Sequence, residues 1–129
     1  MHKGADTAAT NGYVFGLNGG AGSFRFTINN GTYLFSTAGH IILGRWLFVS
    51  VTFSSAGRVL YANAVNVTES GGELTTLPPD IAGTVCIGNR ANATDRAFDG
   101  QIGECGIANR AWTQAEILAL YNASKRRYI

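Results

Sequence analysis

The chain has 129 residues, of which 46% are hydrophobic and 14% charged, with 17 glycines and a formal net charge of +2. This length favours one domain with a single core, and this apolar content excludes a disordered chain. The near-neutral charge, without a basic face that carries aromatic residues, argues against nucleic acid as a partner. No apolar run approaches the roughly 20 residues of a membrane-spanning helix.

The first residues, 1–12, are polar and small and do not form a signal peptide. We therefore expect an intracellular protein, a protein exported by other means, or a piece of a longer chain. Many glycines and few charges are typical of short strands joined by tight turns.

The clearest strand pattern in the first third of the chain is 23–28, where Phe24, Phe26 and Ile28 alternate with more polar residues. Residues 13–17 before it and 32–37 after it also fit strands. The Asn–Gly pair at 30–31 favours a hairpin turn, because it accepts positive φ. These patterns predict an antiparallel meander of three strands.

The strongest strand pattern is 46–53, which is apolar on both faces and so predicts a central strand with Trp46 in the core. Pro78 and Pro79 cannot donate to a β-ladder, so 68–83 is predicted to be a long connection. Further strands are expected at 58–67, 84–89 and 101–108.

The C-terminal part predicts a short capped helix. Thr113 and Glu116 form a capping box, and Ile117, Leu120 and Tyr121 follow at helical spacing as one apolar stripe. So short a helix is unstable alone in water. We expect its stripe to lie against a sandwich and to cover one end of the core as a lid.

Two cysteines do not make a disulfide framework. Alternation places Cys86 on the face opposite Val85 and Ile87, and it places Cys105 with Ile107 on the core face. If so, the two side chains cannot meet with the geometry of a disulfide. Two free thiols are favoured over a bridge.

Taken in order, these residues resemble the laminin-G-like jelly-roll modules of the concanavalin A-like lectin and glucanase superfamily. The resemblance implies an all-β, antiparallel jelly-roll β-sandwich with one short C-terminal α-helix, spanning 1–129 as a single domain. The matching residues are Trp46, Leu60, Tyr61, Asn63, Ile87, Gly88, Phe98, Gly100, Ile102, Asn109, Arg110, Ala111, Thr113, Glu116, Ile117, Leu120 and Tyr121.

The family has further strands before the segment that matches here. A jelly roll has about eight strands in two sheets. We therefore expect a sandwich that is truncated, closed by another chain, or minimal. An unpaired edge beside missing strands would favour a homo-oligomer or a place in a larger assembly.

Catalytic chemistry is not indicated. Superfamily members that cut glycans use two or three carboxylates alternating on one strand, and the expected strand 101–108 offers Glu104 alone. Neither His2 nor His40 is near a cysteine in the sequence. We predict that the protein is not an enzyme, and a remnant glycoside hydrolase is the third hypothesis.

Calcium is a possible cofactor, and no other cofactor is indicated. The loop 88–100 carries Asn92, Asp95 and Asp99, oxygen donors of the kind that calcium binds. The same residue types are common in turns, and Arg90 and Arg96 oppose a cation, so a plain polar loop is the alternative.

Sugar recognition uses an exposed aromatic ring for stacking and amides for hydroxyl groups. The candidate ligand-binding residues are Tyr33, Tyr61, Asn63, Asn89 and Asn92, with Tyr61 equally consistent with packing. We favour a non-enzymatic module that binds carbohydrate or a surface protein through loops at one end of the sandwich. The resemblance implies an extracellular, cell-surface or virion location. The alternative is a purely structural decoration or oligomerisation domain of such an assembly.

Overall fold

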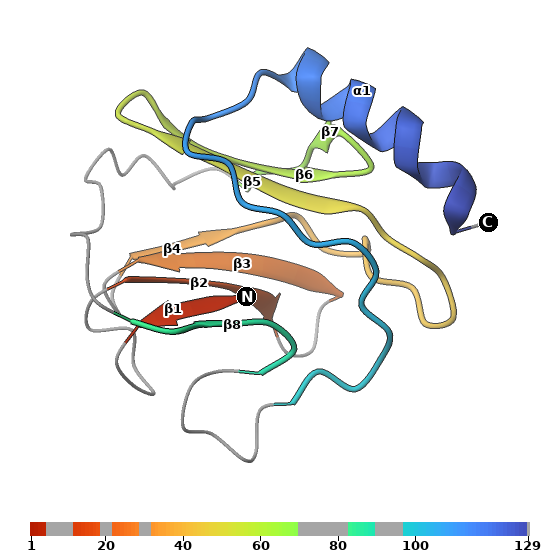
Figure 1. Ribbon diagram of the computed structural model, residues 1–129, viewed down its shortest axis with the longest axis horizontal. Helices are drawn as coiled ribbons and strands as arrows, with labels where there is room; N and C mark the ends of the chain where they lie inside the picture. Colours follow the sequence, from red (N-terminus) through yellow and green to blue (C-terminus); the bar gives the residue numbers. More distant parts are fainter. Residues whose placement is uncertain (5–11, 19–21, 29–31, 70–82, 90–96, 129) are drawn as a thin grey trace.

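The computed structural model describes residues 1–4, 12–18, 22–28, 32–69, 83–89 and 97–128. Its strands form two antiparallel sheets, one of five strands in the order β4-β3-β2-β1-β8 and one of three in the order β5-β6-β7 (Figure 1). The large sheet contains β1 (His2–Gly4), β2 (Gly12–Asn18), β3 (Ser23–Ile28), β4 (Thr32–Phe35) and β8 (Val85–Cys86). The small sheet contains β5 (Val49–Ser54), β6 (Gly57–Ala62) and β7 (Val65–Asn66).

The C-terminal helix α1 (Gln114–Ser124) continues into the 3-10 turn η1 (Lys125–Arg127). Figure 1 shows three layers, in which α1 lies above the small sheet and the large sheet lies below it. The all-β jelly-roll sandwich with one short C-terminal helix is confirmed.

The core lies between the two sheets and is built by strand alternation. Phe24, Phe26 and Ile28 of β3 are buried, as the period of two predicts. Leu60 and Ala62 of β6 face them from the small sheet in the same cluster. The rings of Phe26 and Phe53, 5.9 Å apart, join the two sheets directly.

The predicted meander is confirmed, because β2, β3 and β4 pair in sequence and antiparallel to one another. The strand β1 pairs with β2 and so adds His2, Lys3 and Gly4 to the same sheet. The expected turn at 29–31 lies outside the described residues, as does nearly all of the connection 68–83.

The small sheet differs from the expectation in two ways. Its strand begins at Val49 rather than Trp46, and it is an edge strand rather than a central one. The expected strand 101–108 is wrong, because these residues form no ladder and are all exposed. Alternation of apolar residues can suggest a strand, but a strand forms only where a neighbouring strand supplies backbone hydrogen bonds, and alternation does not reveal that neighbour.

One side of the sandwich is closed by backbone hydrogen bonds between the sheets. The chain that follows β7 pairs with the end of β4: Thr37 N–H donates to the Val67 carbonyl at 2.8 Å, and Glu69 N–H donates to the Phe35 carbonyl at 2.8 Å. The two sheets thus form one strip that bends at this corner. The edges at its two ends are β5 and β8.

The helix packs on the outer face of the small sheet. Ile117 lies in a cluster with Tyr61 and Ala64, and Tyr121 packs against it. Gln114 Nε2 donates to the Ala64 carbonyl at 3.3 Å. The helix does cover the sandwich, but the prediction that it closes one end of the core is wrong, because its apolar partners lie on the face of β6 turned away from the core.

Cys86 and Cys105 are both free thiols, as predicted. The reason given for Cys105 is wrong, however. Neither Cys105 nor Ile107 lies on a core face, since both are exposed in a segment that forms no strand.

Candidate functional site

Tyr33 is the predicted binding residue that the structure leaves available. It lies on β4 with 41% of its surface exposed, and its ring stacks on Phe35 at 5.9 Å with an interplanar angle of 9°. The guanidinium carbon of Arg25 on β3 is 5.6 Å from the centre of the Tyr33 ring. Arg25 pairs with Phe35 across the two strands, so all three side chains lie on the face opposite Leu34, away from the core. We call this set the β3–β4 aromatic surface.

Tyr61 and Asn63 are not free to bind a ligand. Tyr61 is buried beneath α1, which favours the packing role of the two that the sequence allowed. Asn63 stands in the β6–β7 turn with φ 48°, a conformation that asparagine tolerates. Its N–H donates to the Phe48 carbonyl at 2.8 Å, and its Oδ1 accepts from Phe48 N–H at 3.2 Å. This amide fixes the turn.

The predicted calcium ligands are only partly within the described residues. Asn92 and Asp95 lie outside them, while Asp99 is exposed and Asn89 is half-buried. Within the described ranges, no three histidine, cysteine or acidic residues come together as a metal cluster. Calcium binding by this loop stays a prediction.

Two of the predicted binding residues within the described ranges, Tyr33 and Asn89, lie at opposite edges of the large sheet. Tyr33 lies on one edge strand of the large sheet and Asn89 follows the strand at the opposite edge. Four spacings between neighbouring strands put these edges about 19 Å apart. Sequence order cannot reveal such a separation, because it depends on the order of strands in the sheet.

Glu104, the one candidate acid, is held by the C-terminal residues. Its carboxylate accepts from the Arg127 guanidinium, and its backbone N–H donates to the Tyr128 hydroxyl at 3.0 Å. The Tyr128 ring lies 4.8 Å from Trp46, which is 45% exposed. The prediction that Trp46 fills the core is therefore wrong. Trp46 lies in the loop before β5, and its indole packs against the ring of Tyr128 near the C-terminus.

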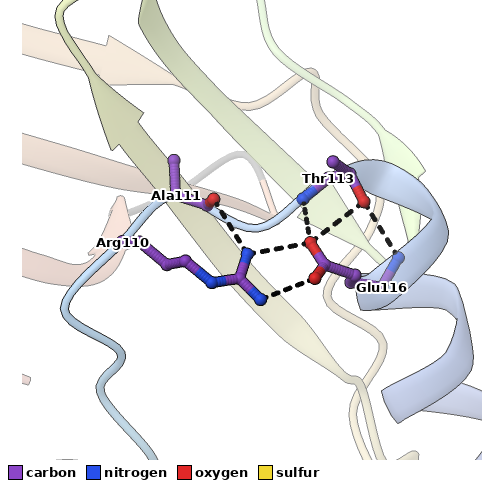
Figure 2. A network of polar contacts seen from close by, with 4 residues as sticks. All are labelled: Arg110, Ala111, Thr113 and Glu116. Atoms are coloured by element: carbon purple, nitrogen blue, oxygen red, sulfur yellow. Dashed lines mark hydrogen bonds and ion pairs between the residues drawn. The ribbon is translucent and has the colours of Figure 1, made fainter.

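A polar network fixes the start of α1 (Figure 2). Glu116 Oε2 accepts from Thr113 N–H at 2.8 Å and Thr113 Oγ1 accepts from Glu116 N–H at 3.3 Å, so the predicted capping box is confirmed. Arg110 donates to both carboxylate oxygens of Glu116, at 3.0 and 2.6 Å. These hydrogen bonds, led by that from Arg110, lower the pKa of Glu116 to about 2, and the same contact raises the pKa of Arg110.

Beside this network is an open groove of about 400 Å³ that the sequence interpretation missed. Trp112, Leu120 and Ala123 line it together with the Arg110–Glu116 pair. The residues 112, 116, 120 and 123 recur at helical spacing, which is the signal that could have indicated it. Leu120 accordingly faces this groove and not the sheet, contrary to the predicted stripe.

Comparison with known proteins gives two matches. A family model for laminin-G-like domains, described as the concanavalin A-like lectin/glucanases superfamily, matches residues 2–118. A crystal structure of residues 221–444 of an S-layer domain-containing protein from Clostridium thermocellum is similar, with a TM-score of 0.51 and 21% sequence identity. The match covers 91% of this chain and 65% of that one, so this chain spans less than two thirds of that structure. At this identity the likeness concerns the fold.

The search of curated proteins gave no match. Neither helical segment of the described chain has the length and apolar composition needed to cross a bilayer.

Proposed function

Because the chain belongs to the laminin-G-like family of the concanavalin A-like lectin and glucanase superfamily, we propose that it is a non-enzymatic recognition module for carbohydrate. The binding position that we propose is the β3–β4 aromatic surface. We prefer this position to loops at one end, because Tyr33 and Asn89, both within the described residues, lie at opposite edges of the large sheet.

The observation that carries the proposal is the stacked pair Tyr33–Phe35 with Arg25 beside it. The two rings are nearly parallel, with Tyr33 exposed and Phe35 half-buried, and together they offer an apolar surface that suits the C–H face of a sugar ring. The guanidinium has several N–H donors in a fixed plane, and sugar hydroxyls can accept from them. An aromatic surface with a polar group beside it is typical of sites that bind a small polar ligand with an apolar face.

The placement of Glu104 and Glu116, two of the acids within the described residues, supports binding rather than cleavage. Glycoside hydrolysis uses a pair of carboxyl groups about 5 Å or more apart across the scissile bond. Glu104 is engaged by Arg127, and Glu116 is engaged by the helix cap and Arg110. These two carboxylates have structural partners, which leaves the remnant-hydrolase hypothesis third.

The similar S-layer domain-containing protein supports an extracellular or cell-surface location. We propose that this module acts in such an assembly, where a glycan or a surface protein would be its partner. The second candidate function, a structural or oligomerisation domain, is favoured by β5, which in the described part of the chain pairs on one side only.

The test is a glycan array probed with the wild-type protein, with calcium and with a chelator. Tyr33→Ala should weaken binding to any glycan that is retained by about threefold to tenfold, because one stacking contact is lost. Phe98→Ala is the matched control: Phe98 is 40% exposed against 41% for Tyr33, and it lies outside the proposed surface.

If no glycan binds under either condition, the carbohydrate proposal is wrong and a protein partner or the structural role takes its place. If Tyr33→Ala and Phe98→Ala weaken binding equally, the carbohydrate proposal can stand but its placement on the β3–β4 aromatic surface is wrong.

A further inference from the structure

The second feature of interest is β5, an edge strand of the small sheet. The strip of strands closes at the corner between β4 and the chain after β7, and it ends at β5 on the opposite side. Within the described part of the chain, β5 pairs with β6 alone. An unpaired edge with free backbone groups is a template for another strand.

The hydrogen bonds of the sheet decide which backbone groups face outward. The carbonyl of Phe48, just before β5, accepts a hydrogen bond from the N–H of Asn63. On β6, the Leu60 carbonyl accepts from Val67 N–H and the Leu60 N–H donates to Thr68 Oγ1, so both backbone groups of Leu60 point away from β5. Residues opposite each other alternate between bonded and non-bonded pairs in an antiparallel ladder. Val51, opposite Leu60, is therefore non-bonded toward β6. It follows that Val49, Val51 and Phe53 point their N–H and C=O groups to the open edge.

The side chains of β5 contain none of the features that normally protect an edge. The segment VSVTFS has no charge, proline or glycine, and such segments pair readily. Val49, Val51 and Phe53 share the core-facing side, since their partners Ala62, Leu60 and Arg58 alternate with Tyr61 under the helix. An added strand would extend the core on this side.

We propose that β5 pairs in antiparallel fashion with β5 of a second copy of this chain, which makes a two-fold dimer with one continuous sheet of the order β7-β6-β5-β5-β6-β7. In the register centred on Val51, Val51 meets Val51 of the other copy and Val49 meets Phe53. Opposed residues in an antiparallel pair point to the same face. This register therefore keeps apolar side chains against apolar ones and Ser50 against Thr52.

A second copy fits better than an unrelated strand because the edge is complementary to itself. An isologous interface needs the same surface on both partners, and a segment without charge meets no like-charge repulsion in its own copy. The helices do not obstruct the pairing. Each packs over β6, and three strand spacings would separate them by about 14 Å, more than the 8–10 Å of packed helices.

Residues 97–111 cross the open side of the molecule (Figure 1). Every one of them is exposed, and no backbone hydrogen bond joins them to β5 in the described chain. Val49, on the core-facing side of β5, also remains exposed. Within the described residues, this segment forms no ladder with β5, so the outward backbone groups of Val49, Val51 and Phe53 can pair with an incoming strand.

The test compares two lysine substitutions in one row of the sheet. Val49 and Val65 both pair with Ala62, from opposite sides, and both are exposed. Sedimentation analysis over a concentration series should show a dimer for the wild type and for Val65→Lys. Val49→Lys should dissociate about tenfold more readily or more, because the lysine lies against Phe53 of the other copy. Circular dichroism spectra and thermal melts show whether each variant is folded.

Hydrogen exchange measured by NMR provides a readout of register that needs no substitution. As the concentration rises, the amides of Val49, Val51 and Phe53 should become about tenfold or more slower to exchange, while those of Ser50 and Thr52 are slow throughout. A wild type that stays monomeric at millimolar concentration overturns the proposal. If the Val49→Lys and Val65→Lys dimers dissociate equally, the β5 interface is wrong. It is also wrong if exchange does not slow selectively at the amides of Val49, Val51 and Phe53 as the concentration rises. None of these outcomes depends on glycan binding, so the two proposals fail separately.

Discussion

At the residue scale, the side chain of Glu116 fixes the position at which α1 begins. Its carboxylate accepts from Thr113 and from Arg110, so it joins the loop before α1 to the first turn of the helix (Figure 2). A carboxylate at this position also meets the positive end of the helix dipole. The charge of Glu116 therefore matters for where the helix begins.

This charge predicts a pH dependence of stability. The pKa of Glu116 is lowered from 4.5 to about 2 in the folded protein. A carboxyl with a depressed folded pKa stabilises the fold above its unfolded pKa, and this contribution is lost as the pH falls through the folded value. Glu116→Gln should therefore lower the thermal midpoint at pH 7, with the gap to wild type closing between pH 4.5 and about 2.

Thermal melts followed by circular dichroism across this pH range measure the effect. Glu69→Gln removes one carboxyl outside this network and serves as the control, whose profile should run parallel to that of the wild type. A gap between Glu116→Gln and wild type that stays constant down to pH 2 would contradict the role of the charge.

At the element scale, α1 is stabilised by the face it buries rather than by its own propensity. Eleven residues are too few for a stable isolated helix in water. Ile117 is 2% exposed in the cluster with Tyr61, whereas its neighbour Leu118 is 46% exposed. The helix therefore depends on the small sheet for its order.

We predict that Ile117→Ala lowers the free energy of unfolding by about 2 to 5 kcal/mol, because a buried side chain is lost and a cavity remains. Leu118→Ala deletes a branched aliphatic side chain of equal size one residue away and should cost less than about 0.5 kcal/mol. Urea denaturation of both variants measures the two values. Similar losses in the two variants would show that α1 does not pack as described.

At the scale of the whole molecule, three distant pieces of chain meet at Tyr128. Its ring lies against Trp46, and its hydroxyl accepts from the N–H of Glu104. A Cβ atom at Gly103 would lie only 2.6 Å from the Tyr128 hydroxyl oxygen. The C-terminal residues thus fasten the strandless segment 97–111 to the loop before β5.

We expect Gly103→Ala to displace the Tyr128 ring, because the atoms that a Cβ would meet are the far end of that side chain. The site is at the surface, so the free energy of unfolding should fall by only about 0.5 to 1 kcal/mol. Gly106→Ala is the matched control, since a Cβ there meets no atom within 4 Å. In a Trp112→Phe background, the fluorescence of Trp46 should change in Gly103→Ala alone. Unchanged fluorescence and stability in both variants would show that the Tyr128 contact is not formed.

The local features of this fold could be predicted from the sequence. Phe24, Phe26 and Ile28 alternate, and Thr113 and Glu116 have the spacing of a capping box, because periodicity and caps are set by neighbours within one or two turns of chain. The ordered set of such signals was enough to identify the family. The candidate site was predicted less well: among the candidates within the described residues, Tyr33 has a surface position that suits binding.

What the sequence determined by itself is therefore the meander of β2, β3 and β4, the capped helix, and the alternation of apolar residues along them. The tertiary structure decided which of those surfaces are covered. Tyr61 is buried because α1 packs on its face of the small sheet. Trp46 lies outside the core, with its ring against Tyr128. Residues 101–108 form no strand, since no strand of the described chain pairs with them. Each of these depends on contacts between residues far apart in the chain, and local periodicity carries no information about them.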